Sequence, residues 1–247
     1  MTSPGLPSIF LLLFIFVLLP AAAWRSARNL RSATGPAPST PLPPRVTIWT
    51  GTLVTQGALL LLAWLIGSSF DFDIFAVRRI GMAELGAAAG ALAVLFGLRA
   101  VSRAIRSEDE KRSMVVFLLA PRTRREWVLW SATGLVASIA EEAAYRGVAY
   151  SILWYSLGDP WIAVLLCAVA FAFGHAVQGW KSGVIVFVMA LVMHALVAFT
   201  GTLVLAMVVH AVYDFVAAYF IGREARAYDA EERKGHVLDG PDGSTRI

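Results

Sequence analysis

Long apolar segments separated by short polar stretches dominate the pattern of this chain. A membrane-spanning helix needs about 20 predominantly apolar residues, and segments of that kind recur along most of the sequence. The candidate spans run over 8–24, 47–69, 81–100, 127–157, 160–178, 182–200 and 202–221. The pattern therefore predicts an all-α, polytopic membrane helix bundle with about seven transmembrane helices.

The composition supports a membrane protein and excludes an ordinary soluble domain. Of the 247 residues, 58% are hydrophobic and only 15% are charged, and the mean hydropathy is +0.68. Soluble domains carry about 25% charged residues. The single cysteine, Cys167, lies inside an apolar segment, so neither an intrachain disulfide nor a cysteine-based metal site is expected.

The positions of Lys and Arg predict the orientation in the membrane. Basic residues concentrate in 25–45, in 99–125 and after position 221. With seven spans these three regions lie on one side, which the positive-inside rule identifies as the cytoplasm. No Lys or Arg precedes the first apolar segment, unlike a secretory signal. We therefore expect an uncleaved anchor with its N-terminus outside, in a multi-pass protein of a bacterial plasma membrane.

Composition changes along the chain predict four parts. The stretch 33–44 is rich in proline and should form an extended linker. The residues after the last apolar segment are polar and should be disordered. The expected parts are an anchor helix with its linker (1–45), two transmembrane helices with a basic loop (46–112), a third part with the remaining apolar segments (113–221) and a disordered tail (222–247).

Two adjacent glutamates inside the fourth apolar segment are the first candidates for chemistry. A charge near the centre of a membrane helix costs at least about 2.5–3.5 kcal/mol, so such residues tend to face a bundle interior or a wet cavity. Glu142 and Arg146 are four residues apart and should share a helix face. Glu141 points about 100° away from Glu142, which leaves it free to face a cavity. A buried carboxylate of this kind suits a general base.

Two later apolar segments add further titratable residues. His175 follows a run of apolar residues, and His210 lies four residues before Asp214, so these two should share a helix face. A carboxylate beside an imidazole fixes its tautomer and orientation. His194 has no polar partner at helical spacing and is expected to pack only. The sequence contains no His-Glu-x-x-His zinc motif.

The motifs resemble a known family of membrane proteases. Glu-Glu-x-x-x-Arg at 141–146, Phe-x-x-x-His at 171–175 and His-x-x-x-Asp at 210–214 follow one another on separate apolar segments. This order resembles the CPBP family (CAAX protease and bacteriocin-processing proteins, also called Abi), which includes the type II CAAX prenyl endopeptidases. The resemblance covers about 113–220 and implies that the third part of the chain, 113–221, is the catalytic core. The prenyl endopeptidases usually carry Asn at the last position, where this chain has Asp214.

The resemblance implies an intramembrane glutamate protease and assigns roles to four residues. Glu141 and His175 would activate a water molecule for attack on the scissile carbonyl. His210 and Asp214 would stabilise the resulting oxyanion, a contribution that is often the largest single one in acyl transfer.

The same resemblance gives the remaining motif residues supporting roles. Glu142 and Arg146 would position Glu141 and His175, and Phe171 would pack. No cofactor is implied. The expected partners are a peptide or protein substrate at the membrane and the lipid bilayer itself. The basic loops are read as topology determinants, and no nucleic acid is expected.

Three alternatives follow from the same residues. Glu141, His175 and His210 form a legitimate three-ligand set for zinc with water as the fourth ligand. A non-catalytic immunity or scaffold protein that keeps the motifs is the second alternative. The third is a proton-coupled transporter, in which a buried Glu/His set relays protons.

The orientation can be tested by cysteine labelling. A cysteine introduced at Glu108, in the basic 99–125 region, should not react with a membrane-impermeant thiol reagent in intact cells, because basic loops stay in the cytoplasm. It should react once the cells are permeabilised. Efficient labelling in intact cells would invert the predicted orientation.

Overall fold

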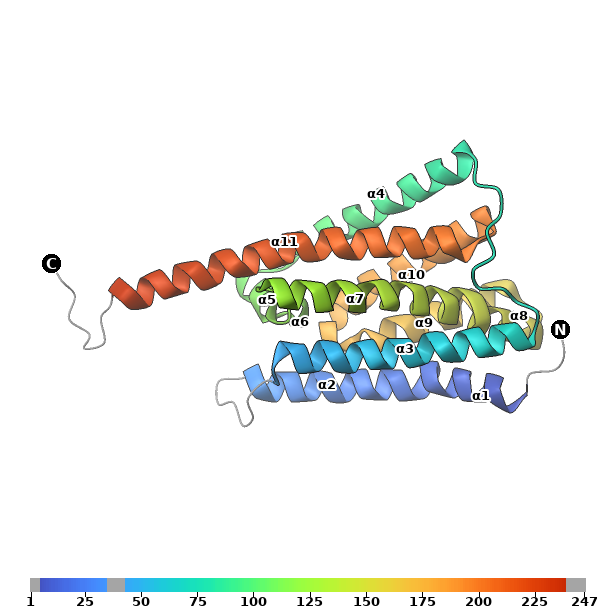
Figure 1. Cartoon of the computed structure of the whole chain (residues 1–247), viewed down its shortest axis with the longest axis horizontal. Helices are drawn as coiled ribbons and strands as arrows, with labels where there is room; N and C mark the ends of the chain where they lie inside the picture. The colour runs from blue at the N-terminus through green and yellow to red at the C-terminus, as the bar shows by residue number, and fades with distance from the viewer. Residues whose placement is uncertain (1–4, 35–42, 239–247) are drawn as a thin grey trace.

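The computed structural model describes residues 5–34 and 43–238 as a bundle of helices, with no strand in these two ranges (Figure 1). The elements are α1 (Leu6–Leu13), the π-helical segment η1 (Phe14–Leu18), α2 (Leu19–Thr34), α3 (Arg45–Ser69), α4 (Met82–Ala104), α5 (Glu108–Ser113), α6 (Val115–Leu118), α7 (Arg124–Glu141), the π-helical segment η2 (Glu142–Ala149), α8 (Tyr150–Leu157), α9 (Pro160–Gly174), the 3-10 turn η3 (Ala176–Gln178), α10 (Trp180–Thr200) and α11 (Leu203–Leu238). The prediction of an all-α bundle is confirmed. Residues 35–42 of the expected Pro-rich linker lie outside the described ranges.

Several of these helices are long and apolar enough to cross a membrane, which confirms a polytopic membrane protein. Among the described residues five helices meet that criterion: Leu6–Asn29, Arg45–Ser69, Met82–Ala104, Trp180–Thr200 and Leu203–Glu231. The helix α9 is apolar but shorter, and the run from α7 through η2 to α8 is interrupted by its π-helical segment. The count of seven is therefore not confirmed.

The outer surface of the bundle is apolar, as a lipid environment requires. Large side chains on the outward faces of most long helices are about half exposed or more, and examples are Ile9, Val54, Trp64, Leu85, Leu165 and Phe199. A soluble protein rarely exposes apolar side chains over so much of its surface. The arrangement is explained if these side chains face lipid.

Small residues let the central helices approach closely around η2. Alanines 140, 143, 144, 149, 168 and 190 are almost fully buried and belong to one apolar cluster. This cluster joins α1, η1, α3, η2, α9 and α10, and every residue of η2 is buried. Close approach over small residues is the usual basis of helix packing in membranes. The segment carrying the Glu-Glu-x-x-x-Arg motif thus lies at the centre of the bundle.

The polar C-terminal part differs from the disorder that the sequence predicts for 222–247. In the structure α11 continues as a helix beyond the bundle (Figure 1). Two ion pairs hold this extension, from Glu224 to Arg103 at 2.8 Å and from Asp229 to Arg122 at 2.9 Å. Most of the charged residues in this part are Glu, Arg and Lys, which are good helix formers. Their helix propensity, the two ion pairs and the preceding apolar helix together extend α11 further than the composition suggests. Residues 239–247 lie outside the described part.

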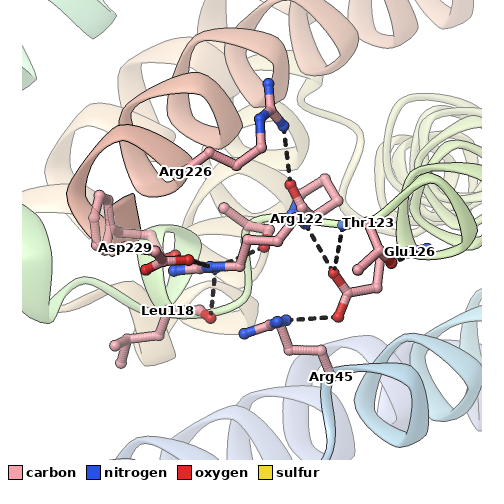
Figure 2. A network of polar contacts seen from close by, with 10 residues as sticks. Arg45, Leu118, Arg122, Thr123, Glu126, Arg226 and Asp229 are labelled. Atoms are coloured by element: carbon pink, nitrogen blue, oxygen red, sulfur yellow. Dashed lines mark hydrogen bonds and ion pairs between the residues drawn. The ribbon is translucent and has the colours of Figure 1, made fainter. Parts of the chain in front are cut away.

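A network of polar contacts fixes the start of α7 (Figure 2). Thr123 and Glu126 form a capping box, in which each side chain accepts a hydrogen bond from the other's backbone N–H. The Glu126 carboxylate also accepts from the Arg122 backbone N–H and from the Arg45 side chain, both at 2.8 Å. Because Arg45 begins α3 and Arg122 bonds to Asp229 of α11, the network ties three helices together at one end of the bundle.

That end of the bundle is called the basic end below. Figure 1 shows that it contains the C-terminal ends of α2 and α11, the N-terminal end of α3 and the short helices α5 and α6. The regions that carry most of the Lys and Arg residues meet there.

The pKa of Glu126 provides a test of this network. Burial raises the pKa of the Glu126 carboxyl, but hydrogen bonds from Arg122, Arg45 and Thr123 outweigh it, so the pKa lies below its ordinary value of 4.5. A depressed pKa stabilises the fold above the unfolded-state pKa, and this stabilisation is lost as pH falls through the folded-state value. Hydrogen bonds to a charged group contribute about 1.5–3 kcal/mol. Glu126→Gln should therefore lower thermal stability in detergent at pH 7 by about that much, and by less at about pH 3.

A matched control comes from the Arg103–Glu224 pair, whose Glu224 side chain is 44% exposed. Glu224→Gln should change the melting temperature less, because exposed ion pairs contribute little. A Glu126→Gln effect that is the same at both pH values would contradict the assignment.

Candidate active site

The structure brings the three motifs to one place in the bundle. Glu141 ends α7, Glu142 and Arg146 lie in η2, His175 caps the C-terminus of α9, and both His210 and Asp214 lie on α11. One cavity of about 1320 Å³ is lined by the members of this set other than Glu142, namely Glu141, Arg146, His175, His210 and Asp214. Residues widely separated along the chain therefore share one cavity.

Glu142 and Arg146 form a fully enclosed ion pair. The Glu142 side chain is 0% exposed, and its Oε1 lies 3.3 Å from Arg146 Nη1. The Arg146 guanidinium also lies over the ring of Phe171, 4.2 Å from its centroid. The shared helix face that the spacing predicts is confirmed. The pair is incompletely satisfied, since Glu142 Oε2 and Arg146 Nε and Nη1 are buried without hydrogen-bond partners in the described ranges.

His210 is held by Glu142. Its Nδ1 donates to Glu142 Oε1 at 2.8 Å, because an ionised carboxylate can only accept. Its Nε2 lies 3.7 Å from Asp214 Oδ2 and 3.9 Å from Glu141 Oε2. Asp214 thus shares a face with His210 as the spacing predicts, but the hydrogen bond goes to Glu142. Glu142 therefore contacts His210 directly, a contact that the resemblance does not imply.

The backbone determines the tautomer of His175. Its Nδ1 lies 2.8 Å from the carbonyl oxygen of Phe171. A carbonyl oxygen only accepts, so Nδ1 carries the proton and Nε2 is the basic nitrogen in the neutral ring. Both His175 and Glu141 line the cavity, and no direct hydrogen bond joins them in the part of the chain that the structure describes.

Glu141 is in a different environment from its neighbour Glu142. It is 8% exposed and lines the cavity, and its Oε1 accepts a hydrogen bond from Gln56 Nε2 at 2.7 Å. The sequence interpretation missed Gln56. An amide inside the apolar segment 47–69 was the available signal, since a polar group in a span needs an internal partner.

Phe171 packs at the centre of the site, as expected. It is 6% exposed, and its ring lies 5.1 Å from that of Tyr145, 4.5 Å from that of His175 and 6.5 Å from that of His210, between ring centroids. Together with the Arg146 guanidinium over its face, these contacts fix the orientation of both imidazoles.

The cavity extends from the motif residues towards the basic end and has a mostly apolar wall. Polar side chains from α4 and α5, including Arg103 and Lys111, lie along it at the basic end. The apolar part of the wall includes Leu59, Leu95, Val186, Met189, Met193 and Ile221. A cavity of this kind accommodates an apolar ligand with a few polar groups that fix its orientation.

Neither Cys167 nor His194 joins the site through a hydrogen bond. Cys167 is a buried free thiol, and His194 is buried with its ring 5.7 Å from that of Tyr150, between centroids. Within the described ranges, no group of three His, Cys, Asp or Glu side chains is placed to hold a metal ion. The alternative zinc ligands that the sequence allows, Glu141, His175 and His210, are therefore not gathered into such a group.

Comparison with known proteins gives one match. Residues 123–216 match a family model described as type II CAAX prenyl endopeptidase Rce1-like. The matched segment includes all six candidate residues and leaves α3, with Gln56, outside. No curated protein and no solved structure matches the chain.

The buried pair predicts a specific pattern of stability. Removing one partner of a buried ion pair costs about 3–5 kcal/mol, because the other charge stays in low dielectric without compensation. Glu142→Ala and Arg146→Ala should each lower the melting temperature in detergent. The double substitution Glu142→Leu with Arg146→Met should recover part of that loss, because the guanidinium is no longer left buried without its carboxylate. Melting temperatures of the single variants equal to that of the wild type would contradict this description.

Proposed function

Residues 123–216 belong to the Rce1-like family of type II CAAX prenyl endopeptidases, and on this basis we propose that the chain is an intramembrane endopeptidase that uses a water molecule activated by Glu141 and His175. The observation that carries the proposal is the convergence of the three motifs on one cavity. Their side chains come from α7, η2, α9 and α11, and the hydrogen bond from His210 to Glu142 joins the first motif to the third.

The first step is attack of water on the scissile carbonyl carbon. Glu141 takes a proton from the water, since its carboxylate lines the cavity and has no cation at hydrogen-bond distance in the described part of the chain. His175 presents its unprotonated Nε2 to the same cavity and orients the water. A positioned general base contributes typically about 10²–10⁴-fold in rate.

The second step produces a tetrahedral intermediate whose oxyanion needs a donor. His210 fulfils this role in its imidazolium form, with Nδ1–H on Glu142 and Nε2–H available for the oxyanion. Asp214, 3.7 Å from Nε2, keeps the ring oriented. A single oxyanion donor of this kind contributes about 10²–10³-fold in turnover.

Collapse of the intermediate completes the reaction with balanced protons. The carbon–nitrogen bond breaks, the water oxygen stays in the new carboxyl group, and the proton that Glu141 accepted passes to the leaving amine. Glu141 is then ionised again and ready for the next water molecule. Arg146 and Glu142 stay paired behind His210 throughout.

The substrate that fits this cavity is a peptide segment that enters from the basic end. The polar side chains at that end and the apolar wall behind them suit a chain with a polar part and an apolar part. If the basic end faces the cytoplasm, cleavage takes place near the cytoplasmic leaflet and the N-terminus lies outside. A bacterial plasma membrane is the proposed location.

Replacement of Glu141 tests the proposal. Purified Glu141→Ala and Glu141→Gln variants in proteoliposomes should lose at least about 10²-fold of the rate at which the wild type cuts a farnesylated peptide ending in a CAAX sequence, or the same peptide without the lipid. Glu84→Gln, in the first turn of α4 and away from the cavity lining, is the matched control and should cut normally. Substantial cleavage by purified Glu141→Ala would remove Glu141 from its role. A wild type that cuts no peptide would favour a scaffold protein or, with substrate flux, a transporter.

The same preparations decide the metal question. In the proposed mechanism chelators leave the activity unchanged. One zinc ion per chain, lost together with activity in His175→Ala and His210→Ala, would replace the mechanism by a zinc-dependent one and leave the protease assignment in place.

A further inference from the structure

Gln56 connects the candidate base to a helix outside the family match. It lies on α3, which packs along α7 (Figure 1), and its side chain lines the same cavity as Glu141. Its Nε2 donates to Glu141 Oε1 at 2.7 Å, across 85 positions in the sequence. This short hydrogen bond is a direct contact between the first half of the chain and the Glu-Glu-x-x-x-Arg motif.

The chemistry of the partner fixes the orientation of the amide. An ionised carboxylate has no proton to donate, so the NH₂ group of Gln56 faces Glu141 and the amide oxygen faces away. That oxygen, Oε1 of Gln56, is buried without a hydrogen-bond partner in the described ranges. A buried acceptor without a partner costs about 1–3 kcal/mol. The hydrogen bond from Nε2 to the Glu141 carboxylate contributes about 1.5–3 kcal/mol. The gain and the cost are of similar size, so fold stability alone gives little reason for an amide here.

The hydrogen bond distinguishes the two oxygens of Glu141. Gln56 occupies Oε1, and Oε2 is the oxygen that lies 3.9 Å from His210 Nε2. Because the donor is neutral, it orients the carboxylate without cancelling its charge. The neighbouring Glu142 has the opposite arrangement, with a guanidinium and an imidazole on its Oε1.

We propose that Gln56 is a positioning residue for the reaction. It holds Glu141 Oε1 and thereby makes Oε2 the oxygen that takes the proton from the attacking water. This inference rests on the proposed function, in which Glu141 is the general base. It extends the site beyond the family-matched segment, since α3 contributes the side chain that selects the working oxygen.

The first test separates positioning from binding. Gln56→Leu should lower kcat by about 10²-fold, because a misplacement of the order of 1 Å costs about that much, and should leave KM within about twofold, since uniform substrate binding is not affected. Thr55→Val is the matched control, since Thr55 is the adjacent, exposed residue of α3 and bonds only to the Gly51 carbonyl in the described ranges. This variant should keep the wild-type kcat and KM.

The second test measures how kcat depends on pH. If Gln56 had only a structural role, replacing it would not produce the pH dependence described here. Gln56→Glu places a second carboxyl group against Glu141, and two carboxyls so close share one proton. With one shared proton, the introduced carboxyl group can still donate a hydrogen bond to the Glu141 carboxylate. This variant should therefore be active at acidic pH and lose activity as pH rises, because the shared proton then leaves the pair. In the wild type the donor to Glu141 is an amide that does not titrate, so the loss of kcat on the alkaline side should begin at a lower pH in the variant than in the wild type. The other titratable groups that line the cavity near the pair, unchanged in every variant, are Tyr145, His175, His210 and Asp214.

The outcomes distinguish this inference from the proposed function. An inactive Glu141→Ala together with Gln56→Leu at the wild-type kcat overturns the positioning role and leaves the protease assignment in place. Wild-type activity in both variants overturns the role of Glu141 and the role of Gln56 with it. If Gln56→Leu fails to fold, the Gln56→Glu variant decides, since a pH profile identical to that of the wild type overturns the inference.

Discussion

The buried carboxylate of Glu142 is the constraint on which the arrangement of this site depends. It has no solvent exposure, and an isolated charge in such surroundings is too costly to tolerate. Two cationic or proton-donating groups compensate it, the Arg146 guanidinium from the same segment and the His210 imidazole from α11. Because both bind one oxygen atom, α11 cannot slide or rotate against η2 without leaving the charge uncompensated. The interaction thus fixes the register between the first and third motifs.

The same constraint explains how two adjacent glutamates acquire different properties. The backbone turns by about 100° between neighbouring residues, so Glu142 points into the packed core and Glu141 points into the cavity. A π-helical segment begins at Glu142, and such segments are often found at functional sites because they alter the direction of side chains within a helix. The carboxylate of Glu142 lies against a guanidinium and an imidazole, whereas that of Glu141 accepts a hydrogen bond from a neutral amide. Pairs of carboxyl groups in contrasting environments are a common way to separate structural and chemical roles.

The parts of the chain outside the family match complete the cavity. The match covers 123–216, but α3 supplies Gln56 and α4 and α5 supply the polar side chains at the basic end. The network around Glu126 holds α3, α7 and α11 together at that end (Figure 2). These helices therefore line the path that a substrate of the proposed protease would take. Substrate choice is expected to depend on these helices more than on the motif residues.

The class of the protein and the faces of its helices could be predicted from the amino-acid sequence. Continuous apolar segments of about 20 residues indicated a helical membrane protein, because a helix satisfies all backbone hydrogen bonds within such a segment. Helical spacing placed Glu142 on one face with Arg146, and His210 on one face with Asp214. Even the contact of His175 with the Phe171 carbonyl follows a local i−4 spacing. The folded bundle alone reveals that His210 donates a hydrogen bond to Glu142 and Gln56 donates one to Glu141, across 68 and 85 positions. It also decided that the polar part of α11 stays helical, through ion pairs to distant residues. The physical reason is that periodicity fixes which side of a helix a residue occupies, whereas the packing of other helices against that side selects the partner it meets.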